Sequence, residues 1–132
     1  MSTVNSPVLL DTSVIIRHFR RDQAVTAQLD AAEALFLPVV VLGELYHGAF
    51  RGRQRENELR CIEELLPAVT VLGITAKTAE FFGQIGAALA LAGTPIPTND
   101  VWVAALAREH GLPVATDDAH FAKVRDLAVV RW

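Results

Sequence analysis

The sequence predicts an α/β fold in which helices cover both faces of a parallel sheet. Short apolar runs alternate with longer segments of helical periodicity along the 132 residues, a pattern typical of parallel strands joined by helical crossovers. Four acids also lie beside apolar sequence: Asp11, Glu44, Asp100 and Asp118. Ligands bind beyond the carboxyl ends of the strands in open parallel sheets. We therefore expect these acids to meet at that edge.

The residue pattern of the first third of the chain predicts a strand, two helices and a second strand. The apolar run 8–10 stops at Asp11, which is typical of a buried strand whose carboxyl end carries an acid. An amphipathic helix follows and ends before the charged residues 20–22. Good helix formers over 24–34 predict the next helix. The apolar run 35–37 then predicts the second strand.

The middle third predicts three helices and a third strand. Pro38 suits the first turn of a helix, because its missing N–H costs nothing there. The polar segment 52–57 predicts a turn, and Pro67 ends the amphipathic helix that follows it. An apolar run at 69–72 predicts the third strand. Alanine content and helical spacing over 75–92 predict a long helix.

The last third predicts one helix and two strands. Asn99 or Asp100 can cap the helix, because both residue types are favoured at that position, and Gly111 provides its stop. The apolar runs 114–116 and 127–130 predict the fourth and fifth strands. The sheet should therefore contain about five parallel strands.

Length and composition favour a single domain over residues 1–132. The chain has 52% hydrophobic and 20% charged residues with a net charge of -3, which fits a folded protein with a large core. Overall charge does not indicate nucleic-acid binding, although arginines cluster locally at residues 17–21 and 51–60. Cys61 is the only cysteine, which excludes an internal disulfide or a multi-cysteine zinc site.

We expect a cytoplasmic protein without a membrane anchor. The start of the chain lacks the basic and long apolar regions of a signal peptide. The most apolar stretch, residues 35–43, is far shorter than the roughly 20 residues that span a bilayer. A single cysteine also suits a reducing compartment.

The four acids predict a site for Mg²⁺ or Mn²⁺. A carboxylate at the edge of a core costs free energy unless it is paired or bound to a cation. Oxygen ligands from distant segments suit such hard ions, which activate water and stabilise charge on a phosphate. The sequence therefore favours a metal-dependent nuclease. Three short polar side chains flank the acids and can orient water or a carboxylate: Thr12, Asn99 and Thr116.

Simpler roles for the same acids remain open. Asp11, Asp100 and Asp118 each suit a helix N-cap, and Glu44 could form an internal salt bridge with an arginine. Asp117 adjoins Asp118, and neighbouring side chains in an extended segment point apart. Three roles are open for Asp117: a group that supports a metal ligand, a surface charge, or the fourth ligand itself. The histidines lack the paired spacing of a zinc site, and Ser13 lacks the partners of a serine nucleophile.

Four motifs occur in order along the chain: LLDTSVII, VVLGELYHGA, IPTNDVWVAALA and ATDDAHF. Together with the final VVRW, they resemble a PIN-domain ribonuclease, the VapC-type toxin of a type II toxin-antitoxin system. The resemblance implies a three-layer α/β/α sandwich, a Mg²⁺- or Mn²⁺-dependent endoribonuclease, a VapB-like antitoxin that blocks the active site, and a homodimer. Structured RNA such as tRNA is the substrate class that it suggests.

Residue by residue, the resemblance assigns the metal-binding and catalytic acids to Asp11, Glu44, Asp100 and Asp118. Asp118 lies in the pattern T-x-D-x-H-F, and Thr12 and Asn99 match flanking polar positions. We further hypothesise that four arginines guide RNA and that an antitoxin occupies the same surface: Arg17, Arg20, Arg51 and Arg53.

Two rival functions can be separated from this one. A phosphatase of the haloacid dehalogenase type also begins with an acid after its first strand, but it needs a second Asp where this chain has Ser13. A noncatalytic module that binds RNA or an antitoxin would keep the fold and lose metal affinity. Cleavage of small phosphoesters would support the first, and RNA binding without cleavage the second.

Overall fold

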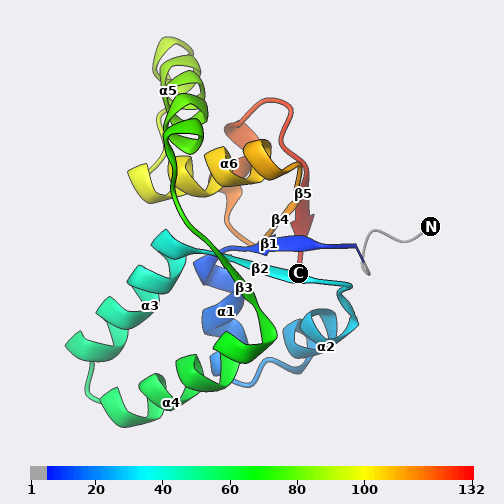
Figure 1. The fold of residues 1–132 in the computed structure, drawn as a ribbon, viewed down its shortest axis with the longest axis vertical. Coiled ribbons are helices and arrows are strands. Elements are labelled where there is room, and N and C mark those ends of the chain that lie inside the picture. The colour runs from blue at the N-terminus through cyan, green and yellow to red at the C-terminus, as the bar shows by residue number, and fades with distance from the viewer. Residues whose placement is uncertain (1–5) are drawn as a thin grey trace.

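Five strands form one parallel sheet in the computed structural model, which describes residues 6–132 (Figure 1). Residues 1–5, which the predicted domain includes, lie outside the described residues. The sheet has the order β3-β2-β1-β4-β5. Its strands are β1 (Val8–Leu10), β2 (Leu35–Pro38), β3 (Thr70–Leu72), β4 (Val114–Thr116) and β5 (Val129–Arg131). The predicted α/β class and parallel sheet are confirmed.

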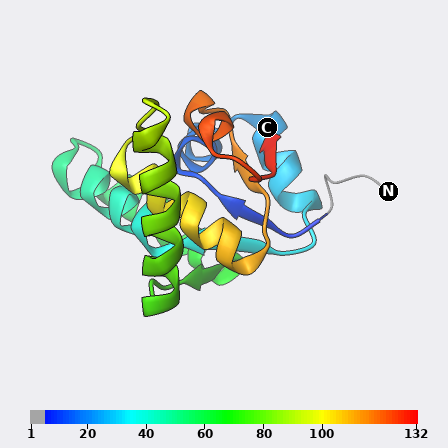
Figure 2. The same ribbon diagram turned by 90° about the horizontal axis from the view of Figure 1, so that it is seen from above.

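The helices lie on both sides of this sheet. The α-helices are α1 (Thr12–Phe19), α2 (Gln23–Ala31), α3 (Val39–Arg51), α4 (Arg55–Leu65), α5 (Ala76–Leu91) and α6 (Thr98–His110). The short 3₁₀ helices are η2 (Leu66–Ala68) and η3 (Ala119–Lys123). The chain steps outward from β1 to β3 and then crosses back to β4. Right-handed crossovers therefore place α1 to α4 on one side and α5 with α6 on the other, as Figures 1 and 2 show.

The central strands β1 and β4 form the most buried part of the sheet. All three residues of each strand are buried, and α6 adds a run of small and branched side chains that are also buried. Leu10 pairs with Ala115 in the register of these strands, and the amide of Asp11 donates to the Ala115 carbonyl at 3.1 Å. The residues that follow β1 and β4 are therefore held side by side.

Two helix boundaries differ from the sequence prediction. Helix α2 ends at Ala31 and not at residue 34, because the Ala34 carbonyl already accepts a hydrogen bond from the Val8 amide at the edge of the sheet. Helix α4 begins at Arg55, inside the predicted turn 52–57. Two glutamates in its first turn favour this start, since they complement the positive end of the helix dipole.

Two predicted helix starts are also corrected. Pro38 ends β2 and occupies the N-cap position, so α3 begins one residue later than predicted. Helix α6 begins at Thr98 after Pro97, and neither Asn99 nor Asp100 is its N-cap. The Asp100 amide instead donates to the Pro97 carbonyl at 3.0 Å. The Asp100 side chain is consequently free to face the sheet edge.

No helix within residues 6–132 is both long enough and apolar enough to cross a membrane.

Candidate active site

Asp11 is a buried acid at the carboxyl end of β1. Its residue is 4% exposed, and its Oδ2 accepts hydrogen bonds from the Thr116 hydroxyl at 2.7 Å and from the Ser13 hydroxyl at 3.0 Å. Asp11 occupies the N-cap position of α1, but its side chain makes no capping hydrogen bond. The side chain is therefore used by neighbouring hydroxyls and not by the helix end.

Glu44 faces the same edge from the second turn of α3. The Thr12 hydroxyl donates to its Oε1 at 3.0 Å. Burial raises the pKa of Glu44, and the charges of Asp11 and Asp100 raise it further, whereas hydrogen bonds from Thr12 and Asn99 oppose the rise. Among the ion pairs of residues 6–132, none joins Glu44 to an arginine. The salt-bridge alternative for this acid is therefore wrong.

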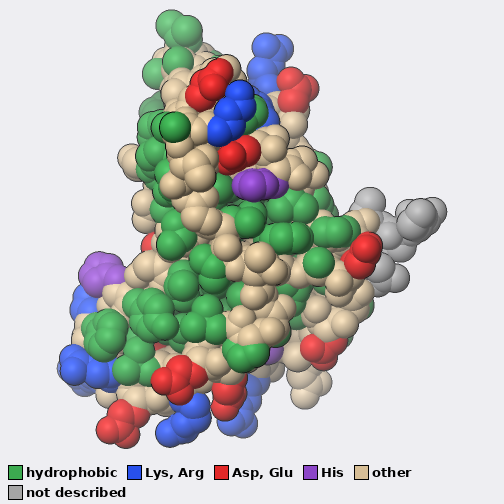
Figure 3. Space-filling model, viewed as in Figure 1, with side chains coloured by type: hydrophobic (Ala, Val, Ile, Leu, Met, Phe, Trp, Pro, Cys, Tyr) green, Lys and Arg blue, Asp and Glu red, His purple; other side chains and the backbone are tan. Residues whose placement is uncertain are grey.

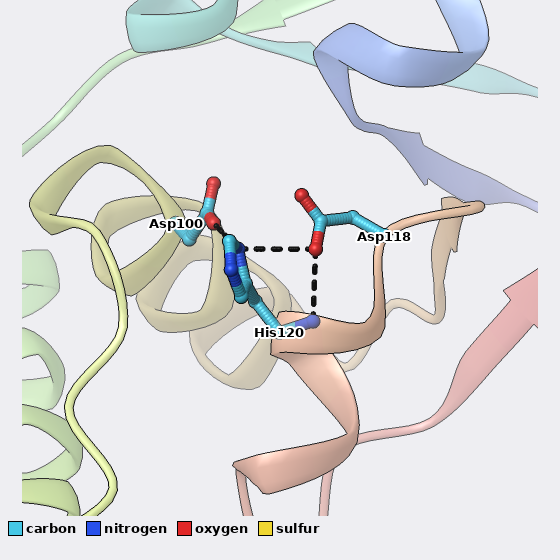
Figure 4. Close-up of side chains that lie close together, drawn as sticks. All are labelled: Asp100, Asp118 and His120. Atoms are coloured by element: carbon cyan, nitrogen blue, oxygen red, sulfur yellow. Dashed lines mark hydrogen bonds and ion pairs between the residues drawn. The ribbon is translucent and has the colours of Figure 1, made fainter.

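Asp100, Asp118 and His120 form a compact cluster (Figure 4). The His120 Nδ1 lies 2.9 Å from Asp100 Oδ2 and 3.0 Å from Asp118 Oδ1. One ligand atom from each residue lies within 4.8 Å of the other two. Asp118 also accepts a hydrogen bond from the His120 amide at 2.9 Å. Asp118 therefore caps η3, as one alternative foresaw, and also belongs to the acidic cluster.

The environment of Asp100 disfavours its charged form. Burial raises the pKa of Asp100, while the hydrogen bond from His120 lowers it and the charges of Asp11 and Asp118 raise it again. The dominance of burial over the histidine contact leaves the pKa above its ordinary value. Because Glu44 responds to Asp11 and Asp100 in the same way, the acids from four segments sense one another's charge.

Asp117 points away from the acidic cluster. Its carboxylate lies 3.3 Å from the Arg17 guanidinium, and its residue is exposed. Asp118 and not Asp117 thus contributes to the cluster that the sequence predicted. Sequence reasoning missed two contributors, His120 and Ser13. The pattern T-x-D-x-H-F contained the signal for His120, whereas Ser13 was recognisable only from its proximity to Asp11 in sequence.

The predicted basic residues divide into three groups. Arg20 and Arg51 line a cavity of about 430 Å³ that also includes Thr12 and Glu44. Arg53 lines a separate, open hollow around residues 52–57. Arg17 is held in ion pairs with Asp22 and Asp117. Two of the four arginines, Arg20 and Arg51, therefore share a cavity with the acidic edge.

The donor chemistry of this edge fits a hard divalent cation. Carboxylate oxygens are the ligands that Mg²⁺ and Mn²⁺ prefer. The carboxylates of Asp100 and Asp118 contact the imidazole of His120, and that of Asp11 accepts a hydrogen bond from the Thr116 hydroxyl. Burial raises the pKa values of Glu44 and Asp100, and the charges of the neighbouring acids raise them further. A bound cation favours the charged forms and would reverse that effect.

Residues 8–127 match the PIN domain family. The chain belongs to the PIN-domain family. This PIN-domain chain is 31% identical over 127 residues to Ribonuclease VapC2 of Haemophilus influenzae, covering 94% of this chain and 96% of the relative. Its identity and coverage are the same against the tRNA(fMet)-specific endonuclease VapC of Shigella flexneri. Both relatives confirm the predicted VapC-type membership.

A solved structure of DNA-bound VapBC from Salmonella typhimurium has the same architecture. It superposes with a TM-score of 0.90 at 26% identity, covering 96% of this chain and 98% of that chain. The likeness confirms the predicted α/β/α sandwich of the PIN domain.

Proposed function

We propose that this protein is a divalent-metal-dependent endoribonuclease and the toxin of a VapBC-type pair. The observation that carries the proposal is that Asp100 and Asp118 cluster with His120 at one edge of a PIN-domain sheet, and that Asp11 and Glu44 lie close enough for the acids to influence one another's charge. The names of the Haemophilus and Shigella relatives support RNA as the substrate and tRNA as a candidate. RNA of this kind is found in the cytoplasm, where we place the protein.

Asp11, Asp100 and Asp118 are the residues that would hold Mg²⁺ or Mn²⁺, with Glu44 beside them. When bound, the ion would polarise a phosphodiester and lower the pKa of water. The remaining contribution comes from how the chain fixes these acids. Thr116 and Ser13 both bind Asp11 Oδ2, so this oxygen is fixed and the orientation of the carboxylate is set. Thr12 orients Glu44 in the same manner.

The reaction class is hydrolysis of a phosphodiester. Water would attack phosphorus, the bond to the 3′-oxygen would break, and that oxygen would take a proton from solvent to leave as a 3′-hydroxyl beside a 5′-phosphate. Glu44 lies within reach of the charges of Asp11 and Asp100, and from that position its carboxylate is suited to accept the proton of the attacking water. The Nδ1 of His120 contacts both Asp100 and Asp118. No covalent enzyme intermediate is needed.

The cavity beside Glu44 is our candidate RNA path. Arg20 and Arg51 line it and are exposed, while Ile16 and Phe19 supply an apolar wall. Arginines neutralise phosphates, and apolar surface accommodates an unstacked base. We assign the guiding role to Arg20 and Arg51, keep Arg53 as a peripheral contact, and remove Arg17, whose guanidinium is engaged within the protein.

The same surface suits a VapB-like antitoxin. A segment laid along this cavity would cover Glu44 and both arginines, and RNA would then be excluded by overlap. Charge reversal of Arg20 and Arg51 to Glu should weaken RNA binding. Unchanged RNA affinity in the double variant, measured by fluorescence anisotropy in moderate salt, would contradict the assigned path.

A homodimer is the assembly that we propose for the free toxin. Large apolar side chains are exposed on α3, β3 and α5, with Phe50 at 53% and Leu91 at 91% exposed. Figure 3 shows hydrophobic surface over α3 and along α5 on one face. Such a surface is typical of a protein–protein contact. Light scattering coupled to size exclusion should give twice the chain mass, and a monomer at micromolar concentration would contradict this assembly.

The direct test is cleavage of total tRNA and of a generic single-stranded RNA by the purified protein. Wild type should cut with Mg²⁺ or Mn²⁺ and not with EDTA. Asp11→Asn and Asp100→Asn keep side-chain size and remove charge, and neither should cut. An exposed acid on α2, changed as Asp30→Asn, is the matched control and should cut normally.

Three results would contradict the proposal. Folded wild type that cuts neither RNA with either metal is not a nuclease of this class. Equal cleavage by the Asn variants would place catalysis elsewhere. Tight RNA binding without cleavage would support a noncatalytic module instead.

A further inference from the structure

Arg17 makes a network of contacts that the proposed RNA path does not use. Its Nε and Nη2 donate to Asp22 Oδ2 at 3.0 and 2.9 Å. Its Nη1 donates to Asp117 Oδ2 at 3.3 Å and to the main-chain oxygen of Trp132. Helix α1 is thereby joined to the α1–α2 corner, to the segment after β4, and to the residue after β5.

Asp22 prepares Arg17 for this role. Its Oδ1 accepts from the amides of Ala24 and Val25 and caps α2, while its Oδ2 takes two guanidinium hydrogens. The hydrogen bond from Arg17 lowers the pKa of Asp22. When a carboxylate binds one edge of a planar guanidinium group, the remaining N–H groups point in a fixed direction. Arg17 therefore points at Asp117 without further ordering.

Asp117 is anchored through all three of its polar groups. Its amide donates to the Ser13 hydroxyl at 3.3 Å, its carbonyl accepts from Arg131 at 3.2 Å, and its carboxylate binds Arg17. The next amide, that of Asp118, donates to the Thr116 hydroxyl at 2.9 Å. Because Ser13 and Thr116 also bind Asp11, the anchoring of this segment is continuous with the Asp11 carboxylate.

We propose that Arg17 and Asp117 form a latch that holds residues 116–118 in place and so positions Asp118 in the acidic cluster. Asp117 is then a positioning residue, and the two adjacent acids, Asp117 and Asp118, have different roles. Asp117, which contacts Arg17, fixes the segment, and Asp118, which contacts His120, would be available to hold a bound cation. Single half-exposed ion pairs contribute little stability, so the effect of the latch should appear in site geometry more than in unfolding.

The proposal rests on the proposed function only where it is tested by metal binding. A second test, hydrogen exchange in metal-free protein, does not depend on that function. The first measurement is Mn²⁺ affinity of the full-length protein by titration calorimetry. Arg17→Ala and Asp117→Asn should each weaken binding by about tenfold, the scale expected when groups that orient ligands are removed. Arg17→Lys should fall between, because an ammonium cannot reach three acceptors as a planar fork does.

A double variant separates positioning from ligation. Arg17→Ala combined with Asp117→Asn should bind Mn²⁺ as Arg17→Ala does, because both changes open the same latch. Asp118→Asn should lose more affinity than either. If Asp117 were the ligand, Asp117→Asn would lose as much as Asp11→Asn, and its effect would add to that of Arg17→Ala. That result would overturn the proposal.

The second measurement is hydrogen exchange of the Asp117 and Asp118 amides in metal-free protein. Both amides donate to hydroxyls, and the latch holds the segment that carries the amides, so exchange should be faster in Arg17→Ala and Asp117→Asn. Arg125→Ala and Asp30→Asn change exposed charges elsewhere and should match wild type. Unchanged exchange in both latch variants would overturn the proposal even if wild type cut no RNA. If the protein lacked nuclease activity but exchange was faster in both latch variants, the proposed function would fail and the latch would stand.

Discussion

Asp11 and Asp100 are acids at the same edge of the sheet, and the protein holds them in opposite ways. Asp11 is 4% exposed and is bound by two neutral hydroxyls, those of Ser13 and Thr116. Asp100 is half-buried, and its Oδ2 lies 2.9 Å from the imidazole Nδ1 of His120. Burial and the charges of neighbouring acids raise its pKa.

The difference separates a fixed part of the site from a responsive part. Hydroxyl partners set the Asp11 carboxylate during folding, since Thr116 is the last residue of β4 and Asp11 directly follows the adjacent strand β1. The Asp100 side gathers negative charge that the protein leaves partly uncompensated. A bound cation would compensate the negative charge around Asp100. The Asp11 carboxylate would already be oriented by its hydroxyl partners.

The largest expected effect comes from removing either charge. Asp11→Asn and Asp100→Asn should each reduce RNA cleavage by at least about a hundredfold, the scale of losing one electrostatic contribution to a transition state. The comparison sharpens if Mn²⁺ affinity is measured alongside single-turnover rates. A variant that retains a rate within a few-fold of wild type would break the assignment of that side of the site.

The next effect should come from the fixed part. Thr116→Val keeps shape but removes the donor to Asp11 and the acceptor for the Asp118 amide. We expect about 2 kcal/mol less free energy of unfolding, as for a lost hydrogen bond to a charged group, and about tenfold weaker Mn²⁺ binding. Urea unfolding and calorimetry would check both. Thr70→Val, at an exposed position on β3, is the control; equal losses in both variants would refute the role of Thr116.

The responsive part should show itself in pH dependence. His120 lowers the pKa of Asp100, so His120→Gln should raise that pKa further. Mn²⁺ binding needs the ionised carboxylate, and the acidic limb of its pH profile should therefore move to higher pH in the variant. An unchanged limb, or a move to lower pH, would show that the imidazole does not govern Asp100.

The smallest effect concerns stability without metal. Glu44 has a raised pKa in the folded protein, so its protonated form stabilises the fold at low pH and that contribution is lost as pH rises through the raised pKa. Glu44→Gln removes the charge and keeps an acceptor for Thr12. In EDTA at neutral pH its melting temperature should rise by about 2–5 °C, and at a pH below the ordinary glutamate pKa the two proteins should melt together. A lower melting temperature at neutral pH would contradict the view of this edge as electrostatically strained.

Sequence patterns predicted the centre of the sheet well because every residue of β1 and β4 is buried. The runs Val8–Leu10 and Val114–Thr116 contain no charged residue, as is typical of strands that are buried on both faces. Boundaries set by contacts between distant segments were not predictable. Ala34 leaves the helical conformation because its carbonyl pairs with Val8, and α4 starts early because charge at its first turn favours the helix.

The acids were predictable from their position, whereas their partners were not. Each of the four acids lies beside apolar sequence, and this contrast can be recognised without a structure: Asp11, Glu44, Asp100 and Asp118. The choice between Asp117 and Asp118 depends on which way each side chain turns, and Arg17 reaches Asp117 across 100 positions of sequence. Ser13 and His120 are ordinary polar residues until the fold brings them to a carboxylate.

Anomalous diffraction at the manganese edge from crystals grown with Mn²⁺ would test the central claim most directly. The account predicts a peak in contact with carboxylate oxygens of Asp11, Asp100 and Asp118, with Glu44 adjacent and Asp117 still bound to Arg17. A peak coordinated by Asp117, or no peak at this edge at a metal concentration that supports cleavage, would contradict the account.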